Sequence, residues 1–194
     1  MSNEDSSMKA HIIDCAVQLY KKHGYKNVSV SDICELSGIT RSGFYYHFKS
    51  KDEILDGYLL IPEVMPSTLI TENLISILDT SNYYKQFYYI FKMFMERVIA
   101  VGPEILGLIF KRDIDAGINY MSPPNVAMWD VYLALIRRAQ EAGDIENSMP
   151  AEQIVEAIIF LSQGVALMWL NKNGSFDYIE KCRVMIETLV RVKH

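Results

Sequence analysis

Residues 29–48, with the sequence SVSDICELSGITRSGFYYHF, decide the fold of the first part of the chain. Ser29 precedes a segment, 30–37, whose apolar residues recur at helical spacing, and Gly38 closes it. Thr40 then opens a second segment that extends to about Phe48. Because serine and threonine are good helix N-caps and glycine readily ends a helix, the pattern predicts two short helices joined by a tight turn. Such a pair is the unit of a helix-turn-helix.

The side chains of the second segment suit a helix that reads DNA. In a helix-turn-helix the second helix lies in the major groove, and its N-terminal residues face base edges. Arg41 can donate two hydrogen bonds to a guanine, whereas Thr40 and Ser42 can address several bases. Glycine at position 43 allows close approach of the backbone. The candidate DNA-binding residues are Ser29, Thr40, Arg41, Ser42, Gly43, Tyr45, Tyr46, His47, Lys49 and Lys51.

The charge of the whole chain argues against a nucleic-acid partner, but the charge of this region does not. The chain carries a formal net charge of -5, and its pI is near 5.4. Residues 21–51 hold six lysines and arginines and two acidic residues, a net charge of +4. Since local charge sets the field near a groove, the acidic total does not exclude DNA binding.

Helical spacing also dominates the rest of the chain, which predicts an all-α fold of about nine helices. Four short helices fall within the first sixty residues, beginning with 8–23 and ending with one that starts near Ser50. The helices expected further on are 68–78, 82–101, 103–116, 125–142, 150–171 and 176–192. Convincing strands, internal repeats and low-complexity tracts are absent from the sequence.

Several bulk features indicate a cytoplasmic protein. The three cysteines, Cys15, Cys34 and Cys182, are too few and too scattered for a disulfide framework. The polar, acidic N-terminus has no signal-peptide pattern. We expect no membrane segment, since the most apolar stretch, 157–170, is shorter than the roughly 18 residues required and contains Ser162, Gln163 and Gly164.

Residues 38–55, GITRSGFYYHFKSKDEIL, resemble the signature of TetR-type transcriptional regulators, and the preceding segment from about Ala10 fits the same family. The resemblance implies a homodimer with a DNA-binding domain, 1–55, and a helical ligand-binding and dimerisation domain, 56–194. It also implies that DNA bases or the adjoining backbone are faced by Thr40, Arg41, Ser42, Gly43, Tyr45 and Tyr46. Phosphates would be contacted by Tyr45, His47 and Lys51. One departure is Gly43, where many members carry a threonine or another side chain.

The second domain is rich in aromatic and methionine side chains, which suit a cavity for an apolar or planar molecule. For any one of them, a place in the ordinary hydrophobic core is the simpler interpretation. The candidate ligand-binding residues are Phe87, Phe91, Phe94, Met95, Phe110, Met128, Trp129, Tyr132 and Met168.

The last two helices are the best candidates for a dimer interface. Each carries an apolar stripe, and Gly164 would allow a close helix approach, so two helices from each subunit could form a four-helix interface. The alternative is that both stripes pack within one chain. The candidate interface residues are Ile158, Leu161, Val165, Trp169, Met185 and Leu189.

Other chemistry finds little support in the sequence. His11 and Cys15 are four residues apart and could face one metal ion, but a zinc site needs three or four ligands, so we expect no metal. Phosphate-binding loops, nucleophile elbows and HExxH motifs are absent, and we expect neither a cofactor nor an enzyme. The hypothesis is a repressor that a small molecule releases from a palindromic DNA operator. The alternatives are a helical protein-interaction module and a ligand-binding enzyme.

Overall fold

The computed structural model describes residues 3–58, 80–117 and 128–193. Over these ranges the chain forms nine α-helices and one short 3-10 helix, and its only β-type pairing is an isolated bridge between Ile145 and Val192. The expected all-α class is therefore confirmed. The helix expected at 68–78 and the first residues of the one expected at 125–142 lie outside the described ranges.

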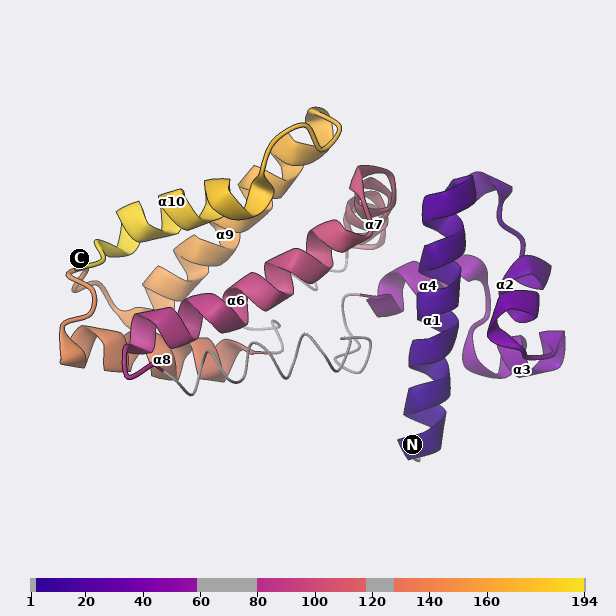
Figure 1. The fold of residues 1–194 in the computed structure, drawn as a ribbon, viewed down its shortest axis with the longest axis horizontal. Coiled ribbons are helices and arrows are strands. Elements are labelled where there is room, and N and C mark those ends of the chain that lie inside the picture. The colour runs from indigo at the N-terminus through magenta and orange to yellow at the C-terminus, as the bar shows by residue number, and fades with distance from the viewer. Residues whose placement is uncertain (1–2, 59–79, 118–127, 194) are drawn as a thin grey trace.

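The first part of the chain, residues 3–58, is a small helical unit that we call the head. Its elements are α1 (Asn3–His23), η1 (Tyr25–Asn27), α2 (Val30–Ser37), α3 (Arg41–His47) and α4 (Lys51–Tyr58). α1 packs against α2 and α4, and α2 packs against α3 (Figure 1). Ile12, Ile13, Ile33, Phe44 and Phe48 are at most 1% exposed and form the centre of the head. Burial of these side chains holds α3 in place on α2.

The remaining described residues, 80–117 and 128–193, form a larger unit that we call the body. Its helices are α6 (Tyr83–Ala100), α7 (Pro103–Ala116), α8 (Trp129–Ala142), α9 (Ala151–Asn171) and α10 (Tyr178–Val190). α6 packs against α8 and α10, and α9 packs against α7, α8 and α10. Figure 1 shows these long helices crossing one another on the side of the molecule away from α2 and α3.

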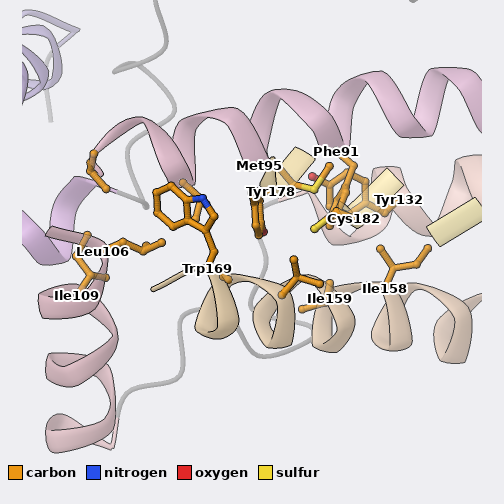
Figure 2. Close-up of a cluster of buried hydrophobic side chains, with 14 of the residues drawn as sticks. Phe91, Met95, Leu106, Ile109, Tyr132, Ile158, Ile159, Trp169, Tyr178 and Cys182 are labelled. Carbon is orange, nitrogen blue, oxygen red and sulfur yellow. The ribbon is translucent and has the colours of Figure 1, made fainter. Parts of the chain in front are cut away.

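Aromatic rings fill the space between α6 and α8. Phe87 and Phe91 stack with their ring centroids 5.6 Å apart, and the Tyr132 ring meets both of them edge-on at 5.5 and 5.6 Å. Figure 2 shows the same hydrophobic core continuing to Trp169 on α9 and to Tyr178 and Cys182 on α10. Edge-to-face contacts of this kind favour a fixed arrangement of the rings.

The head meets the body where α4 contacts α7. Arg112 of α7 places Nη1 3.7 Å from Oδ2 of Asp52, near the start of α4. The same carboxylate accepts a hydrogen bond from the hydroxyl of Tyr25, just after α1. Asp52 therefore joins two parts of the head to the body.

Helix α9 corrects one expectation from the sequence, that no segment is long and apolar enough to span a membrane. By length and composition, Ala151–Asn171 is long and apolar enough to cross a membrane, because Ser162, Gln163 and Gly164 lower its mean hydropathy too little. A core helix can have the same composition, and α9 packs against three neighbouring helices.

Candidate nucleic-acid interface

Helix α2 begins at a capping box made by Ser29 and Asp32. The backbone N–H of Asp32 donates to Ser29 Oγ at 3.2 Å, and the backbone N–H of Ser29 donates to Asp32 Oδ2 at 2.7 Å. The Ser29 hydroxyl also donates to Asp32 Oδ2 at 2.7 Å, and the two hydrogen bonds that this carboxylate accepts from Ser29 lower the pKa of Asp32 below its ordinary value. At the other end, Gly38 adopts φ 69°, the left-handed conformation that glycine reaches without strain. Both ends of α2 are thus fixed by local sequence, and the chain turns directly into α3.

Thr40 caps α3 in the same way. Its Oγ1 accepts from the backbone N–H of Gly43 at 3.1 Å and lies 2.9 Å from Ser42 Oγ. Thr40 and Ser42 remain exposed at the start of the helix. They therefore present hydroxyl groups at the end of α3 that a helix-turn-helix directs toward bases.

The outer face of α3 carries side chains that its own packing does not use. Tyr45 is 52% exposed and Tyr46 is 78% exposed, whereas Phe44 between them and the turn is fully buried. Arg41 is exposed in the first turn, and within the described residues its guanidinium has no hydrogen bond or ion pair. An unpaired arginine beside two exposed tyrosines is a surface ready to donate hydrogen bonds to a partner.

His47 faces the start of α1 and not open solvent. Its Nδ1 lies 3.2 Å from Asp5 Oδ1, and its side chain is 11% exposed. Its ring also meets the Tyr46 ring edge-on at 4.9 Å. A DNA phosphate would therefore have to compete with the carboxylate of Asp5 for His47.

The two lysines expected to bind phosphates have different surroundings. Lys49 is exposed at the end of α3. Lys51 turns inward, where Nζ donates to the carbonyl oxygens of Tyr25 at 2.9 Å and Val28 at 2.8 Å and lies 4.4 Å from the Tyr25 ring centroid. These contacts assign Lys51 to holding α4 against the turn after α1, and we no longer propose it as a phosphate ligand.

One cation close to the end of α3, Lys9, is not among the residues predicted to bind DNA. Lys9 of α1 lies over the Phe48 ring, with Nζ 5.3 Å from the ring centroid. It lies more than thirty residues before α3 in sequence, outside the basic window of 21–51. Helical spacing predicts which face of α1 carries Lys9, but only the fold shows that this face lies beside the end of α3.

On another side of the head, α1 and α2 border a hollow with acidic residues. It is lined by Leu19, His23, Asn27, Val28, Asp32, Glu35 and Leu36. Its two carboxylates, Asp32 and Glu35, would repel phosphates. This contrast favours the exposed side of α3 as the face for nucleic acid.

The structure separates the candidate ligand-binding residues into three groups. Phe87, Phe91, Met95 and Tyr132 are fully buried between α6 and α8, and Phe94, Phe110 and Trp129 are half-buried around the same hydrophobic core. Met128 is 37% exposed and Met168 is 51% exposed. Met168 lies on the outer side of α9, away from the buried cluster, so its role in a ligand site stays a prediction.

The candidate dimer residues are also divided. Ile158, Val165 and Trp169 are at most 8% exposed and pack inside the body, so their assignment to an interface needs correction. Met185 is 41% exposed, and Leu161 and Leu189 are half-buried. The apolar surface that α9 and α10 leave uncovered, which we call the outer strip, consists of Phe160, Leu161, Gly164, Leu167, Met168, Val184, Met185 and Leu189.

The two candidate metal ligands, His11 and Cys15, lie side by side on α1. Cys15 Sγ lies 3.8 Å from Nε2 of His11. Within the described ranges, no group of three potential metal ligands comes together. The three cysteines are all buried and free.

A family model described as "Bacterial regulatory proteins, tetR family" matches residues 12–58, which span the head from within α1 to the end of α4. TtgR, a transcriptional regulator of Pseudomonas putida, is 36% identical over 56 residues, or 29% of this chain. That match spans only 27% of the length of TtgR. KstR2, a transcriptional repressor of Rhodococcus jostii, is 24% identical over 181 residues, which cover 88% of this chain and 83% of KstR2.

Solved structures extend the likeness to the body. FadR of Thermus thermophilus, a TetR-family transcriptional repressor in complex with lauroyl-CoA, has a TM-score of 0.62 at 16% identity. The match covers 93% of this chain and 92% of that one. FadR of Bacillus subtilis, in complex with stearoyl-CoA, has a TM-score of 0.56 at 17% identity and covers 95% and 98%. At these identities the likeness concerns the fold alone.

Head and body together define a helix-turn-helix protein with an attached helical domain. Residues 12–58 carry the helix-turn-helix of the TetR family, and the relatives that share this segment, such as TtgR, are transcriptional regulators. The resemblance in residues 38–55 is therefore confirmed.

Proposed function

We propose that this protein is a sequence-specific transcriptional repressor that binds DNA through α3. The observation that carries the proposal is the exposed face of α3, where Arg41, Tyr45 and Tyr46 stand clear of the packing that holds the helix. Arg41 reaches the edge of a guanine, while Thr40 and Ser42 contact neighbouring bases. Tyr45, Tyr46 and Lys49 bind the phosphates on either side.

The experiment begins by selecting DNA fragments with the purified protein and sequencing them, which gives the operator. The variant Arg41→Ala should then weaken operator binding by about 1–3 kcal/mol and relax the preference at one base position. Arg137→Ala is the matched control, because Arg137 is an exposed arginine on α8, where it pairs with Glu152. Equal affinities for wild type and Arg41→Ala, measured by fluorescence anisotropy at one salt concentration, would remove Arg41 from the interface.

The second part of the proposal is a twofold dimer formed through the outer strip. Phe160, Leu167 and Met168 on α9 are each more than half exposed, and Val184 and Met185 are exposed on α10, which packs against α9. Contiguous apolar surface on a protein commonly marks an interaction site. A second copy of this chain suits it, since a twofold pair would present two α3 helices to successive major grooves of a palindromic operator.

Leu167→Glu tests the dimer, because it would bury a carboxylate in the interface. We expect wild type to have the mass of a dimer in light scattering, and the variant that of a monomer. Ile114→Glu is the control, since Ile114 is 80% exposed on α7 and lies outside the outer strip. A monomeric wild type, or a dimeric Leu167→Glu variant, would contradict this part of the proposal.

The third part concerns the effector, for which we propose a small, largely apolar molecule bound within the body. The buried aromatic cluster of α6 and α8 supports an apolar ligand, and the two FadR structures in complex with acyl-CoA make that class the first to test. A ligand that shifts α7 would move Arg112 against Asp52 and so tilt α4 and the head. Ligand and DNA would then weaken each other's binding by the same factor.

Adding lauroyl-CoA to the protein–operator complex should release the DNA, whereas coenzyme A without the acyl chain should not. The measurement is anisotropy of labelled operator at fixed salt. Unchanged operator affinity at saturating lauroyl-CoA, with binding verified by calorimetry, would contradict the switch. Failure of lauroyl-CoA to bind would exclude the acyl-CoA class as effector.

A further inference from the structure

The hydrophobic core of the body contains a hydroxyl group that bonds to none of the described residues. Tyr132 of α8 is fully buried, and its hydroxyl has no hydrogen-bond partner among the described residues. Its ring is held edge-on against Phe87 and Phe91. A buried hydroxyl without a partner is destabilising, because the group loses its hydrogen bonds to water and gains none in exchange.

A second tyrosine, Tyr84, has an unpartnered buried hydroxyl, but its surroundings differ. Tyr84 lies on α6 near Arg183 and Glu187 of α10, and the charge of Glu187 adds to burial in raising the pKa of Tyr84. Charged groups of the chain therefore lie close to that hydroxyl. Burial alone raises the pKa of Tyr132, and no charged group of the described residues contributes. Of the two, Tyr132 is therefore the one for which the described residues supply no charged neighbour, and a ligand is the partner to test.

Water is a poor candidate for that partner. A buried water molecule needs two to four polar neighbours, whereas the Tyr132 ring packs against the apolar rings of Phe87 and Phe91 and its hydroxyl has no polar partner among the described residues. A ligand with an apolar body satisfies the site better, since it contacts the rings while one of its polar atoms accepts from the hydroxyl. Met95, one turn after Phe91 on α6, belongs to the same buried cluster, and its flexible side chain can move to admit such a body (Figure 2).

The surroundings of Tyr132 also limit the charge of the ligand. The tyrosine hydroxyl stays protonated and is a neutral donor. An ionised ligand group at this depth would lose its hydration without meeting a counter-charge, which is costly. A neutral acceptor such as a ketone, ester or thioester carbonyl matches the hydroxyl without that cost.

We propose that the Tyr132 hydroxyl is the polar anchor of the effector site, and that the effector is a largely apolar molecule that presents a neutral carbonyl oxygen to it. This inference rests on the proposed effector binding within the body. It assigns to α8 the group that selects the ligand and to α6 the rings that contact its apolar part.

The test compares two small probes of similar shape. Acetophenone carries a neutral carbonyl, whereas isopropylbenzene has no acceptor. Protein labelled with ¹³C at the methionine methyl groups reports entry at this cluster through the Met95 resonance, which Met95→Leu identifies. In wild type we expect saturable shifts with acetophenone binding at least about tenfold more tightly, the effect of one hydrogen bond to a buried group.

Tyr132→Phe should bring the two probes to the same affinity, because it removes the donor and keeps the ring. The matched control is Tyr178→Phe: Tyr178 is equally buried, but its hydroxyl already donates to the Ser162 carbonyl at 3.2 Å. The control should keep the preference for acetophenone. Tyr132→Phe should also unfold at the same temperature as wild type or higher, and Tyr178→Phe at a lower one.

Absence of a Met95 shift with acetophenone, or the same preference in Tyr132→Phe as in wild type, would overturn the proposal. Operator binding by wild type without probes is scored separately. If it fails while the probe preference holds, the proposed DNA function is wrong and the anchor stands. If operator binding holds and the preference is absent, the anchor alone is wrong.

Discussion

Head and body use their aromatic residues in opposite ways. In α3, two of the three consecutive aromatic residues, Tyr45 and Tyr46, point into solvent, and only Phe44 holds the helix in place. In α6, Phe87 and Phe91 are both buried and stack on each other. The head leaves side chains free for a partner, whereas the body encloses them. A surface for a large, charged partner and an interior for a small, apolar one need these two different arrangements.

Phe44→Ala should have the largest effect, because it removes the ring that fixes α3. Truncation of a buried phenylalanine costs about 3–5 kcal/mol, which is a large share of the stability of a unit as small as the head. Both tryptophans, Trp129 and Trp169, lie in the body. We expect far-UV circular dichroism to show loss of helix while tryptophan fluorescence stays unchanged.

Phe91→Ala is the control for that variant, since the same truncation in α6 should alter tryptophan fluorescence. If Phe44→Ala changes both signals together, head and body unfold as one cooperative unit. The proposed domain boundary near residue 55 would then not separate two units that unfold independently.

Lys51→Ala and Lys49→Ala sharpen the contrast within the head itself. Lys51→Ala removes two charge-assisted hydrogen bonds to backbone carbonyls and should lower the free energy of unfolding by about 1.5–3 kcal/mol. Lys49→Ala should leave stability unchanged and reduce the salt dependence of operator binding by about one phosphate contact. Urea denaturation and a salt titration of DNA binding measure the two effects. Equal stability of both variants would mean that these contacts of Lys51 do not stabilise the head, and would favour a role for Lys51 in binding phosphate.

Ser29→Ala should cost about 0.5–2 kcal/mol, because it removes the N-cap of α2. Thermal unfolding gives the change, and Ser31→Ala is the control, since Ser31 is an exposed serine inside the same helix. An equal loss in both variants would mean that the capping box contributes nothing.

Asp32 makes the same cap dependent on pH. Its pKa is lowered in the folded chain by the hydrogen bonds from Ser29, so the carboxylate stabilises the fold above its ordinary pKa of 3.8. That stabilisation disappears as the pH falls through the lowered value. We expect the difference in melting temperature between wild type and Asp32→Ala to be constant from neutral pH to about pH 5 and to shrink below pH 4. A difference that persists at pH 2 would exclude the charge of Asp32 as its source.

Gly43→Ala should have the smallest effect, and it should be stabilising. A Cβ at this position would lie 3.4 Å from Thr40 Oγ1 and 3.7 Å from Ile39 Cβ, so the fold has room for it. Alanine is better than glycine inside a helix by about 0.5–1 kcal/mol. A lower melting temperature for Gly43→Ala would mean that α3 needs the flexibility of glycine.

The sequence predicted the head well because its signals are local. The caps Ser29 and Thr40 and the terminating Gly38 act within four residues of the groups that they bond. The contacts of Lys51 were not foreseen, because its partners, the carbonyls of Tyr25 and Val28, are more than twenty residues away. A lysine after a reading helix has the same appearance in sequence whether it faces phosphate or the interior.

The body was predicted less completely. Helix α9 is apolar around most of its circumference, so its sequence offers two stripes of almost equal hydrophobicity. The stripe of Ile158, Val165 and Trp169 turned out to face α7, α8 and α10, and the stripe of Phe160, Leu167 and Met168 faces solvent. Helical periodicity identifies the two sides but cannot rank them when both are apolar.

The sequence by itself determined the helical class, the helix-turn-helix and the order of the residues on α3, because caps and spacing act between neighbours in the chain. The tertiary structure decided which side of α9 is buried, that Lys51 supports α4, and that the Tyr132 hydroxyl is enclosed without a partner among the residues that the structure describes. Burial depends on what other segments bring to the same place, and that information is spread over residues far apart in the chain.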